Sequence, residues 1–274
     1  MICVSIVLIA SGFVVHDSSE VKTQSVVIKN KAFAEVLAGK KIAHLSDLHL
    51  IAKHVSKTDS LLKKLRSIRP DMILLTGDYV RWYGKPQDAE VVFNFMRKLT
   101  APLGVFAVMG DSDYSLSTAE CVFCHSEGGA KLQGLNQTRF LRDSFFDVEI
   151  EGRTVRIAGI DCGASIEPFR KIDSALMDSL TAIQPTILLS HSSLAFTKVP
   201  EDRHVLTLAG DTHGGQVWLP TFLWKILKRK PDPEHMHGLF QYGAKMLYVT
   251  SGVGTSDMHF RFGVPPEIAV FEFE

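Results

Sequence analysis

Aspartate and histidine side chains recur in this sequence directly after short apolar runs. Five segments show the pattern: "KIAHLSDLHL", "DMILLTGDYV", "GVFAVMGDSDY", "PTILLSHSS" and "VLTLAGDTHGGQ". The polar residues that end them include Asp47, His49, Asp78, Asp111, His191, Asp211 and His213. Carboxylates and imidazoles are suitable ligands for Mn, Fe, Zn or Mg, and closely packed carboxylates repel one another unless cations lie among them. The pattern therefore predicts a metal site, if the fold brings these side chains together.

The third segment, "GVFAVMGDSDYS", raises a specific question. Its apolar residues 105–109 are typical of a buried strand, yet Asp111, Ser112 and Asp113 follow within four positions. A lone aspartate after glycine is usually a turn residue or a helix cap. Two carboxylates and a hydroxyl at the end of one of several such strands instead favour a role in chemistry.

The elements that must position these residues can be predicted from periodicity. Each apolar run has the length of a buried strand, and helical spacing lies between several runs. We expect a helix over residues 58–68, capped by Thr58 or Asp59, another over 91–99, and a third over the segment "EPFRKIDSALMDSLTAI". Strands that alternate with helices indicate a layered α/β fold, in which functional sites collect beyond the carboxyl ends of the strands.

The segments "SDLHL", "TGDYV", "MGDSD", "LLSHSS" and "GDTHGGQ" resemble, in this order, the five motifs of the calcineurin-like metallophosphoesterases. Their usual forms are D-x-H, G-D, G-N-H-D/E, a lone H and G-H-x-H. The resemblance runs from about residue 41 to the C-terminus, where "YVTSGVGTSDMHFRFGVPPEIAVFEF" is similar to the tail of the G-H-T-H-G-G-Q subgroup. It implies a four-layer α/β/β/α sandwich of two mixed sheets flanked by helices, with two divalent metal ions at one edge.

The resemblance also implies which residues hold each ion. The first ion takes Asp47, His49, Asp78 and His213, all of which match the family motifs. The second takes Asp78, Asp111, His191 and Asp211, where Asp111 replaces the usual Asn and Asp211 the usual His. These two replacements add two negative charges, which favours a harder ion such as Mn or Mg over Zn in the second site.

Ser112 stands where the family has a histidine that assists the leaving group, and Asp113 stands where a carboxylate orients that ring. A serine hydroxyl is a poor proton donor near neutral pH compared with imidazole. Gly214 and Gly215 would let the backbone approach a phosphate. The resemblance therefore implies a metal-dependent hydrolase that uses a metal-bound hydroxide on a phosphoester, phosphodiester or pyrophosphate bond. The alternative is a non-catalytic metal-binding or redox-linked protein on the same fold.

Composition and the N-terminus bear on partners and location. The chain has 274 residues, 46% of them hydrophobic, and a formal net charge of zero, so nothing indicates a nucleic-acid partner. Residues 2–15, "ICVSIVLIASGFVV", are almost wholly apolar but short for a membrane-spanning helix. We interpret residues 1–20 as a leader or anchor with a tether and 21–274 as the metallophosphoesterase domain. An exported or membrane-associated protein acting on a phosphorylated small molecule or a lipid-linked substrate is expected, with a buried element and a cytoplasmic location as alternatives.

The segment "CVFCH" places Cys121, Cys124 and His125 in the haem-attachment pattern C-x-x-C-H. The pattern is short, and cysteines three residues apart share one face of a helix. A disulfide or redox pair is an alternative. We interpret the two cysteines as inert helix side chains that carry no haem.

Overall fold

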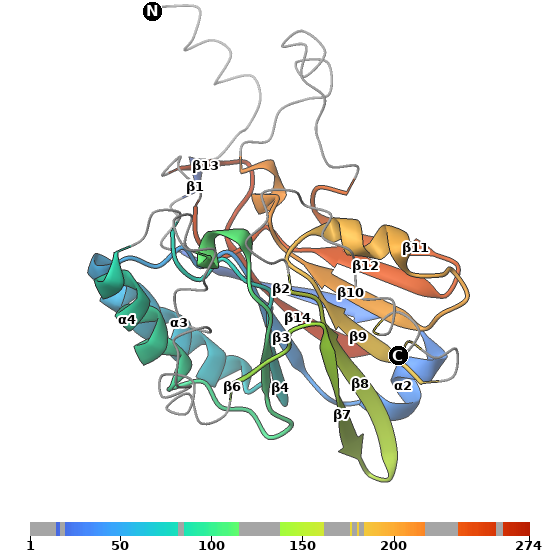
Figure 1. Ribbon diagram of the computed structural model, residues 1–274. Coiled ribbons are helices and arrows are strands. Elements are labelled where there is room, and N and C mark those ends of the chain that lie inside the picture. Colours follow the sequence, from blue (N-terminus) through green and yellow to red (C-terminus); the bar gives the residue numbers. More distant parts are fainter. Residues whose placement is uncertain are drawn as a thin grey trace, which may run out of the picture.

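The computed structural model describes residues 15–16, 20–81, 85–114, 138–161, 176, 180, 184–216, 235–255 and 260–274. Two six-stranded sheets pack against each other, and helices α3 and α4 cover the outer side of one of them (Figure 1). The predicted α/β architecture with two mixed sheets is therefore confirmed.

The first sheet carries three of the five motif strands. Its strand order is β2-β14-β3-β4-β5-β6, and all pairs are parallel except β14 with β3. The strands are β2 (Lys22–Ile28), β14 (Glu267–Phe273), β3 (Ile42–Leu45), β4 (Met72–Leu75), β5 (Val105–Ala107) and β6 (Thr138–Phe140). Because β3, β4 and β5 are parallel neighbours, the residues that follow them leave the sheet at one edge.

The second sheet carries the other two motif strands. Its order is β11-β12-β10-β9-β8-β7, with antiparallel pairs only at its two ends. The strands are β11 (Gly238–Tyr242), β12 (Lys245–Val249), β10 (Val205–Ala209), β9 (Thr186–Leu189), β8 (Arg153–Gly159) and β7 (Ser144–Ile150). The parallel pair β9 and β10 delivers His191, Asp211 and His213 to its own carboxyl end.

The motif strands are buried on both faces, which explains why they read as continuous apolar runs. In β4, Met72 and Leu74 point into the core between the sheets, while Ile73 and Leu75 point toward the helices on the outer side. The same alternation continues through residues 105–109, although the regular strand β5 ends at Ala107. Strand β5 is thus shorter than the predicted run.

Helices lie between the strands as expected, but with different bounds. Helix α3 is Val55–Ile68 with His54 at its N-cap, so the predicted start at Thr58 or Asp59 is wrong. Thr58 lies inside the helix, where its hydroxyl donates to the Val55 carbonyl at 2.7 Å. Helix α4 is Pro86–Met96, which leaves Leu99 beyond its end. Most of the third predicted helix lies outside the described residues.

Smaller elements complete the layers. Short helix α2 (Lys31–Leu37) contacts β8 and β14, and short 3₁₀ helices follow several motif strands. These are η1 (Ala52–His54), η2 (Asp111–Asp113), η3 (Ser193–Lys198) and η4 (His213–Gly215). Leu176 and Leu180 are buried with Ala195 of η3 against the outer face of the second sheet.

The end of the apolar N-terminal segment pairs with the C-terminal part of the chain. Residues Val15–His16 form β1, which is antiparallel to β13 (Arg261–Phe262). Within the described ranges, no helix combines the length and apolar character that crossing a membrane requires. The boundary between leader and domain at residue 20 stays a prediction.

Candidate metal centre

The first half of the centre gathers Asp47, His49 and His213. Their ligand atoms lie within 4.8 Å of one another, and all three side chains are buried. The Nε2 atoms of His49 and His213 are 3.0 Å apart, and His213 Nε2 is 3.7 Å from Asp47 Oδ1. The two imidazole nitrogens and the Asp47 carboxylate are therefore close enough together to hold one cation.

The second half gathers around His191. Its Nε2 lies 3.3 Å from Asp78 Oδ1, 3.8 Å from Asp111 Oδ1 and 4.0 Å from Asp211 Oδ1. Asp78 and His191 are buried, whereas the side chains of Asp111 and Asp211 are 57% and 48% exposed. The two most exposed candidates are therefore the ones that depart from the family pattern.

Asp78 lies between the two halves. One of its oxygens faces His191, and the other lies 3.5 Å from His49 Nε2. This is the arrangement that a carboxylate shared by two ions requires, while its role as a bridging ligand stays a prediction. The structure brings all seven residues predicted as ligands into one region.

The backbone at the centre is strained. Asp47, His49, Asp78, Asp211 and His213 have φ values of 52°, 41°, 56°, 70° and 52°. Residues other than glycine rarely adopt this left-handed conformation, and each such residue costs on the order of 1–3 kcal/mol. Five of the seven candidate ligands are thus held in an unfavourable conformation by their surroundings, which is typical of functional sites.

Backbone carbonyls orient two of the histidine rings. Nδ1 of His191 lies 2.8 Å from the Thr76 carbonyl, and Nδ1 of His49 lies 3.3 Å from the Val80 carbonyl. Since a carbonyl can only accept, Nδ1 of each ring carries a proton, and Nε2 is the ring atom that faces the other candidate ligands. Metal-binding histidines commonly have such an outer partner.

The charges of the centre are out of balance without cations. Burial raises the pKa of Asp78 well above its usual range; the charge of His191 opposes this shift, and the like charges of Asp111, Asp113 and Asp47 add to it. Burial alone would raise the pKa of Asp47, but His213, His191 and His49 together lower it. Burial and neighbouring His213 lower the pKa of His49 to about 3, which keeps its ring neutral and able to bind a metal.

Two buried atoms of the centre support its fit to metal ions. Asp47 Oδ2 and His191 Nε2 are buried and have no hydrogen-bond partner. Buried polar atoms without partners are rare, and each needs an explanation. Carboxylate oxygen and imidazole nitrogen match the donor set of Mn, Fe, Zn or Mg. The residues present therefore fit the metal ions that the sequence predicts.

Ser112 and Asp113 face the loops of the centre. The Ser112 hydroxyl donates to the Val80 carbonyl at 2.8 Å, the same carbonyl that faces His49. Asp113 is fully buried and accepts backbone N–H groups of Asp78, Tyr79, Val80 and Gly110. The geometry favours a structural role for Asp113, because it joins two motif loops. The predicted catalytic roles of Ser112 and Asp113 stay predictions.

Gly214 and Gly215 have φ values of 60° and 76°. Their N–H groups donate to the hydroxyl and the carbonyl of Thr212, and an added Cβ would meet Val264 at Gly214 and Met236 at Gly215. The turn thus needs both glycines for its own packing. Their predicted contact with a phosphate stays a prediction.

Arg261 is a residue of the centre that the sequence analysis missed. It is completely buried, and one Nη atom lies 3.2 Å from His213 Nδ1. Its guanidinium also donates to the carbonyls of Ser251 and Gly254, in a loop whose Gly254 N–H donates to the Asp47 carbonyl. A lone arginine in the apolar C-terminal segment "FRFGVPPEIAV" was the signal that could have indicated it.

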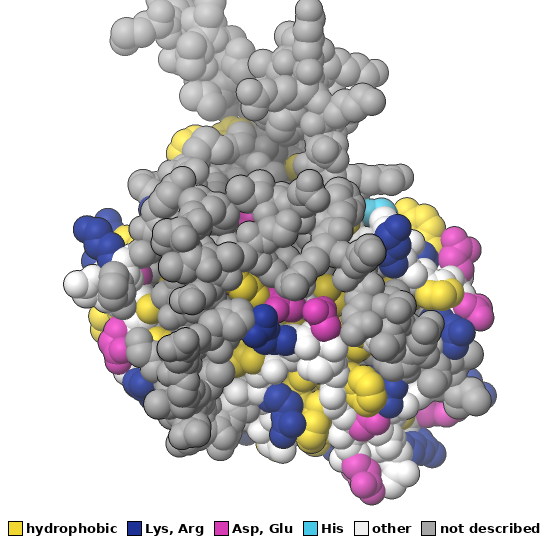
Figure 2. All heavy atoms as spheres, viewed as in Figure 1, with side chains coloured by type: hydrophobic (Ala, Val, Ile, Leu, Met, Phe, Trp, Pro, Cys, Tyr) yellow, Lys and Arg dark blue, Asp and Glu magenta, His cyan; other side chains and the backbone are white. Residues whose placement is uncertain are grey.

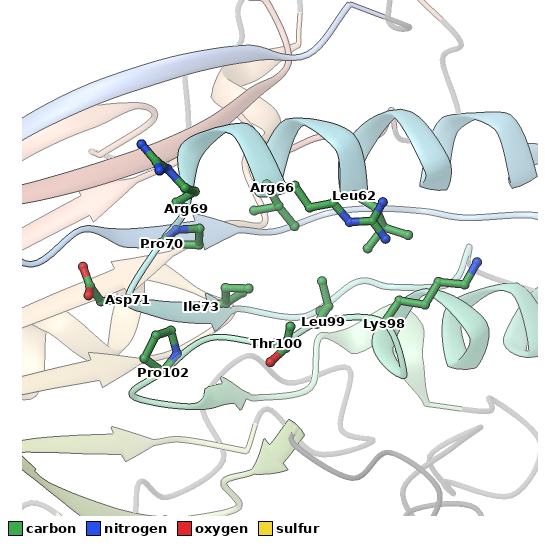
Figure 3. Close-up of a pocket in the computed structure, with 11 residues that line it drawn as sticks. Leu62, Arg66, Arg69, Pro70, Asp71, Ile73, Lys98, Leu99, Thr100 and Pro102 are labelled. Carbon is green, nitrogen blue, oxygen red and sulfur yellow. The ribbon is translucent and has the colours of Figure 1, made fainter.

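Three further features concern the rest of the chain. Cys121, Cys124 and His125 fall outside the described residues, so the absence of haem stays a prediction. A hollow of about 340 Å³ lies between the end of α3 and the segment after α4, lined by Leu65, Arg66, Asp71 and Lys98 among others (Figure 3). It lies at the opposite end of β4 from Asp78. Acidic and basic side chains are intermixed on the described part of the face in Figure 2.

Comparison with known proteins agrees with this geometry. A sequence profile described as calcineurin-like phosphoesterase matches residues 40–214. The uncharacterized metallophosphoesterase YkuE of Bacillus subtilis is 30% identical over 256 residues, which cover 92% of this chain and 85% of that protein.

Two further similarities were found. The UDP-2,3-diacylglucosamine pyrophosphatase LpxG of Chlamydia muridarum is 26% identical over 285 residues, which cover 88% of this chain and 85% of that protein. Among solved structures, TT1561 of Thermus thermophilus superimposes with a TM-score of 0.48 at 13% identity, covering 78% of this chain and 90% of that one.

Proposed function

Since this chain belongs to the calcineurin-like phosphoesterase family, we propose that it is a metal-dependent hydrolase of phosphate esters that acts on a diphosphate or an activated diester. The observation that carries the proposal is the convergence of seven Asp and His side chains, among which the buried atoms Asp47 Oδ2 and His191 Nε2 have no hydrogen-bond partner. We propose manganese as the ion to test first, because the centre has two more carboxylates than the family pattern.

Two divalent cations at such a centre supply activated water and neutralise the charge that develops on a phosphate. The chain itself has to hold the ligands in place. Thr76 and Val80 fix the rings of His191 and His49 through their carbonyls. Asp113 fixes the backbone of Asp78 through its N–H group. These contacts place the ligand atoms before a substrate arrives, which lowers the reorganisation that the reaction needs.

The residue at position 112 indicates which leaving groups the centre can release. Its hydroxyl is buried and donates to the Val80 carbonyl, and serine does not protonate a leaving oxygen near neutral pH. A basic alkoxide leaves poorly without a proton, whereas a phosphate or an aryl oxide leaves as an anion. The absence of the histidine therefore favours pyrophosphate bonds and aryl esters over simple alkyl esters.

A lipid-linked substrate is part of the proposal. The similarity to LpxG supports it, since that protein is named for a pyrophosphatase of a diacylated sugar nucleotide. The segment that follows Gln216, "VWLPTFLWKILKRK", combines tryptophans and aliphatic residues with a basic end, a composition favoured at membrane interfaces.

The place where the leader joins the domain is consistent with membrane association. Strand β1, at the end of the apolar leader, pairs with β13, and Arg261 of β13 contacts His213. The Phe262 N–H donates to the Gln216 carbonyl at 3.0 Å. Residues 15–16 and Gln216, where the two apolar segments meet the described domain, thus lie beside the metal centre, so a membrane that bound these segments would lie near that centre.

Hydrolysis is tested by supplying Mn²⁺, Zn²⁺, Fe²⁺ or Mg²⁺ to chelator-treated protein. We expect turnover of bis(p-nitrophenyl) phosphate and of a nucleotide sugar with Mn²⁺, and loss of turnover when chelator is added back. The Asp78→Ala variant is the control for contaminating phosphatases. No turnover with any metal and substrate, in protein that nevertheless binds the ions, would favour the non-catalytic alternative.

A further inference from the structure

Three basic side chains from separate parts of the chain meet at the loop of residues 253–255. Lys57 Nζ donates to the Val253 carbonyl at 3.3 Å, and Arg261 Nε donates to the Gly254 carbonyl at 3.0 Å. Arg81 lies 3.5 Å from the Thr255 hydroxyl. The three cations thus contact the same three residues from different elements: helix α3, the segment after β4, and strand β13.

We propose that Lys57 and Arg81, together with loop 253–255, form a subsite for a second phosphate of the substrate, next to the metal centre. The proposal rests on the proposed function, because the first phosphate is the one held at the metals. Arg261 is completely buried and contributes only its charge, whereas Lys57 and Arg81 are partly exposed and are the groups that an anion can reach.

The loop connects this cluster to the metal ligands. The Val253 N–H donates to the Ser46 carbonyl at 3.0 Å, and the Gly254 N–H donates to the Asp47 carbonyl. Gly252 packs so closely on Asp47 that an added Cβ would lie 2.7 Å from the Asp47 Cβ. Loop 253–255 therefore contacts both the three cations and the residues around Asp47, which places the proposed subsite next to the first half of the centre.

Two of the cations are held beside like charges without an acidic partner in contact. Neither Lys57 nor Arg261 belongs to any of the ion pairs among the described residues. Burial, together with the charges of Arg261 and Arg81, lowers the pKa of Lys57 to about 8. Burial, Lys57, Arg81 and Lys53 lower the pKa of His54 to about 4. Like charges held together oppose folding, and a bound anion removes that cost.

The experiment compares two ligands that differ by one phosphate. α,β-Methylene-ADP has two phosphates and a bridge that does not hydrolyse, and AMP has one, so the nucleoside contribution is shared. Binding to metal-loaded protein is measured by calorimetry for the parent and for Lys57→Gln. We expect Lys57→Gln to weaken α,β-methylene-ADP about tenfold, as loss of one charge-assisted contact implies, and AMP by less than about twofold.

Matched variants separate this result from general damage. Lys63→Gln lies on the exposed part of the same helix and should leave both affinities unchanged. Lys57→Arg keeps the charge and should keep most of the affinity. If Lys57→Gln does not fold, Arg81→Gln tests the same expectation from the other side of the loop.

Two results would overturn the subsite. One is an affinity for α,β-methylene-ADP that stays within about twofold of the parent in Lys57→Gln. The other is an equal loss for both ligands, which would place the effect of Lys57 on the metal centre itself. Since the readout is binding and not turnover, the subsite and the hydrolytic activity stand or fall separately.

Discussion

Asp113→Asn is the change that most directly separates a structural role from a catalytic one. The Asp113 carboxylate accepts the N–H groups of Asp78, Tyr79 and Gly110 at 2.8 Å and that of Val80 at 3.3 Å. Burial raises its pKa to about 7, so at pH 8 the group is ionised and all its contacts are acceptor contacts. An asparagine keeps one acceptor oxygen and turns an NH₂ group toward the remaining backbone donors.

The expected loss of stability follows from the number of N–H groups that an asparagine cannot satisfy. One amide oxygen can accept from two of the donors, which leaves about two buried N–H groups unsatisfied at roughly 1–3 kcal/mol each. A loss of about 4 kcal/mol corresponds to a fall in Tm of about 8–16 °C for a domain of this size. The assay is thermal unfolding at pH 8 in the presence of chelator, so that loss of metal does not contribute.

Asp111→Asn is the matched control. It lies two residues away in the same one-turn helix, its side chain is 57% exposed, and the change restores the usual residue of the family. We expect its Tm in chelator to stay within about 2 °C of the parent, as is usual for exposed positions. If Asp113→Asn is equally stable but inactive, then the carboxylate does not hold the two loops, and its predicted role in orienting a catalytic group gains support.

Three further predictions concern the centre and its surroundings. Asp78→Ala should lose both metal ions and Asp211→Ala mainly one, as measured by elemental analysis; equal metal content in Asp78→Ala and the parent would contradict the shared ligand. Ser112→His should raise kcat/KM by about tenfold for an alkyl phosphodiester and little for a p-nitrophenyl ester, because only the alkoxide needs a proton; an equal change for both would show that position 112 does not face the leaving group. Burial lowers the pKa of His44 from 6.5 to about 4, so the folded protein binds this proton less readily than the unfolded chain. The free energy of unfolding should therefore fall by about 2–3 kcal/mol as the pH drops from 7 to 4.5. Urea unfolding should show a smaller fall in His44→Gln, and an equal fall in the variant and the parent would mean that His44 is not the group responsible.

The gathering of the candidate metal ligands could be predicted because strand ends in a parallel sheet share one edge. Asp47, Asp78 and Asp111 follow β3, β4 and β5, and His191 and Asp211 follow the parallel pair β9 and β10. Apolar runs that end in Asp or His can be recognised in the local sequence. The order of the five motifs then indicated which of these residues belong to one centre. The alternation of strands and helices predicted a layered α/β fold, and the resemblance to the family implied its two sheets.

What could not be predicted depends on loop conformation and on distant contacts. Arg261 is 48 residues from His213 in sequence, and no local pattern connects them. Asp113 points inward because it accepts the N–H groups of the loop after β4, and the path of that loop could not be predicted. The start of α3 was misplaced because Thr58 looks like a cap in the sequence, whereas its hydroxyl binds the Val55 carbonyl within the first turn.

The left-handed backbone of the ligands limits how this centre can change in evolution. Among residues other than glycine, Asp, Asn and His accept positive φ most readily, and the same types can bind metals. At position 211, with φ 70°, the exchange of the family's His for Asp stays within that small set. A β-branched residue there would lose the ligand and also clash with its own backbone. The charge at position 211 can therefore change without a change in the backbone conformation that this position requires.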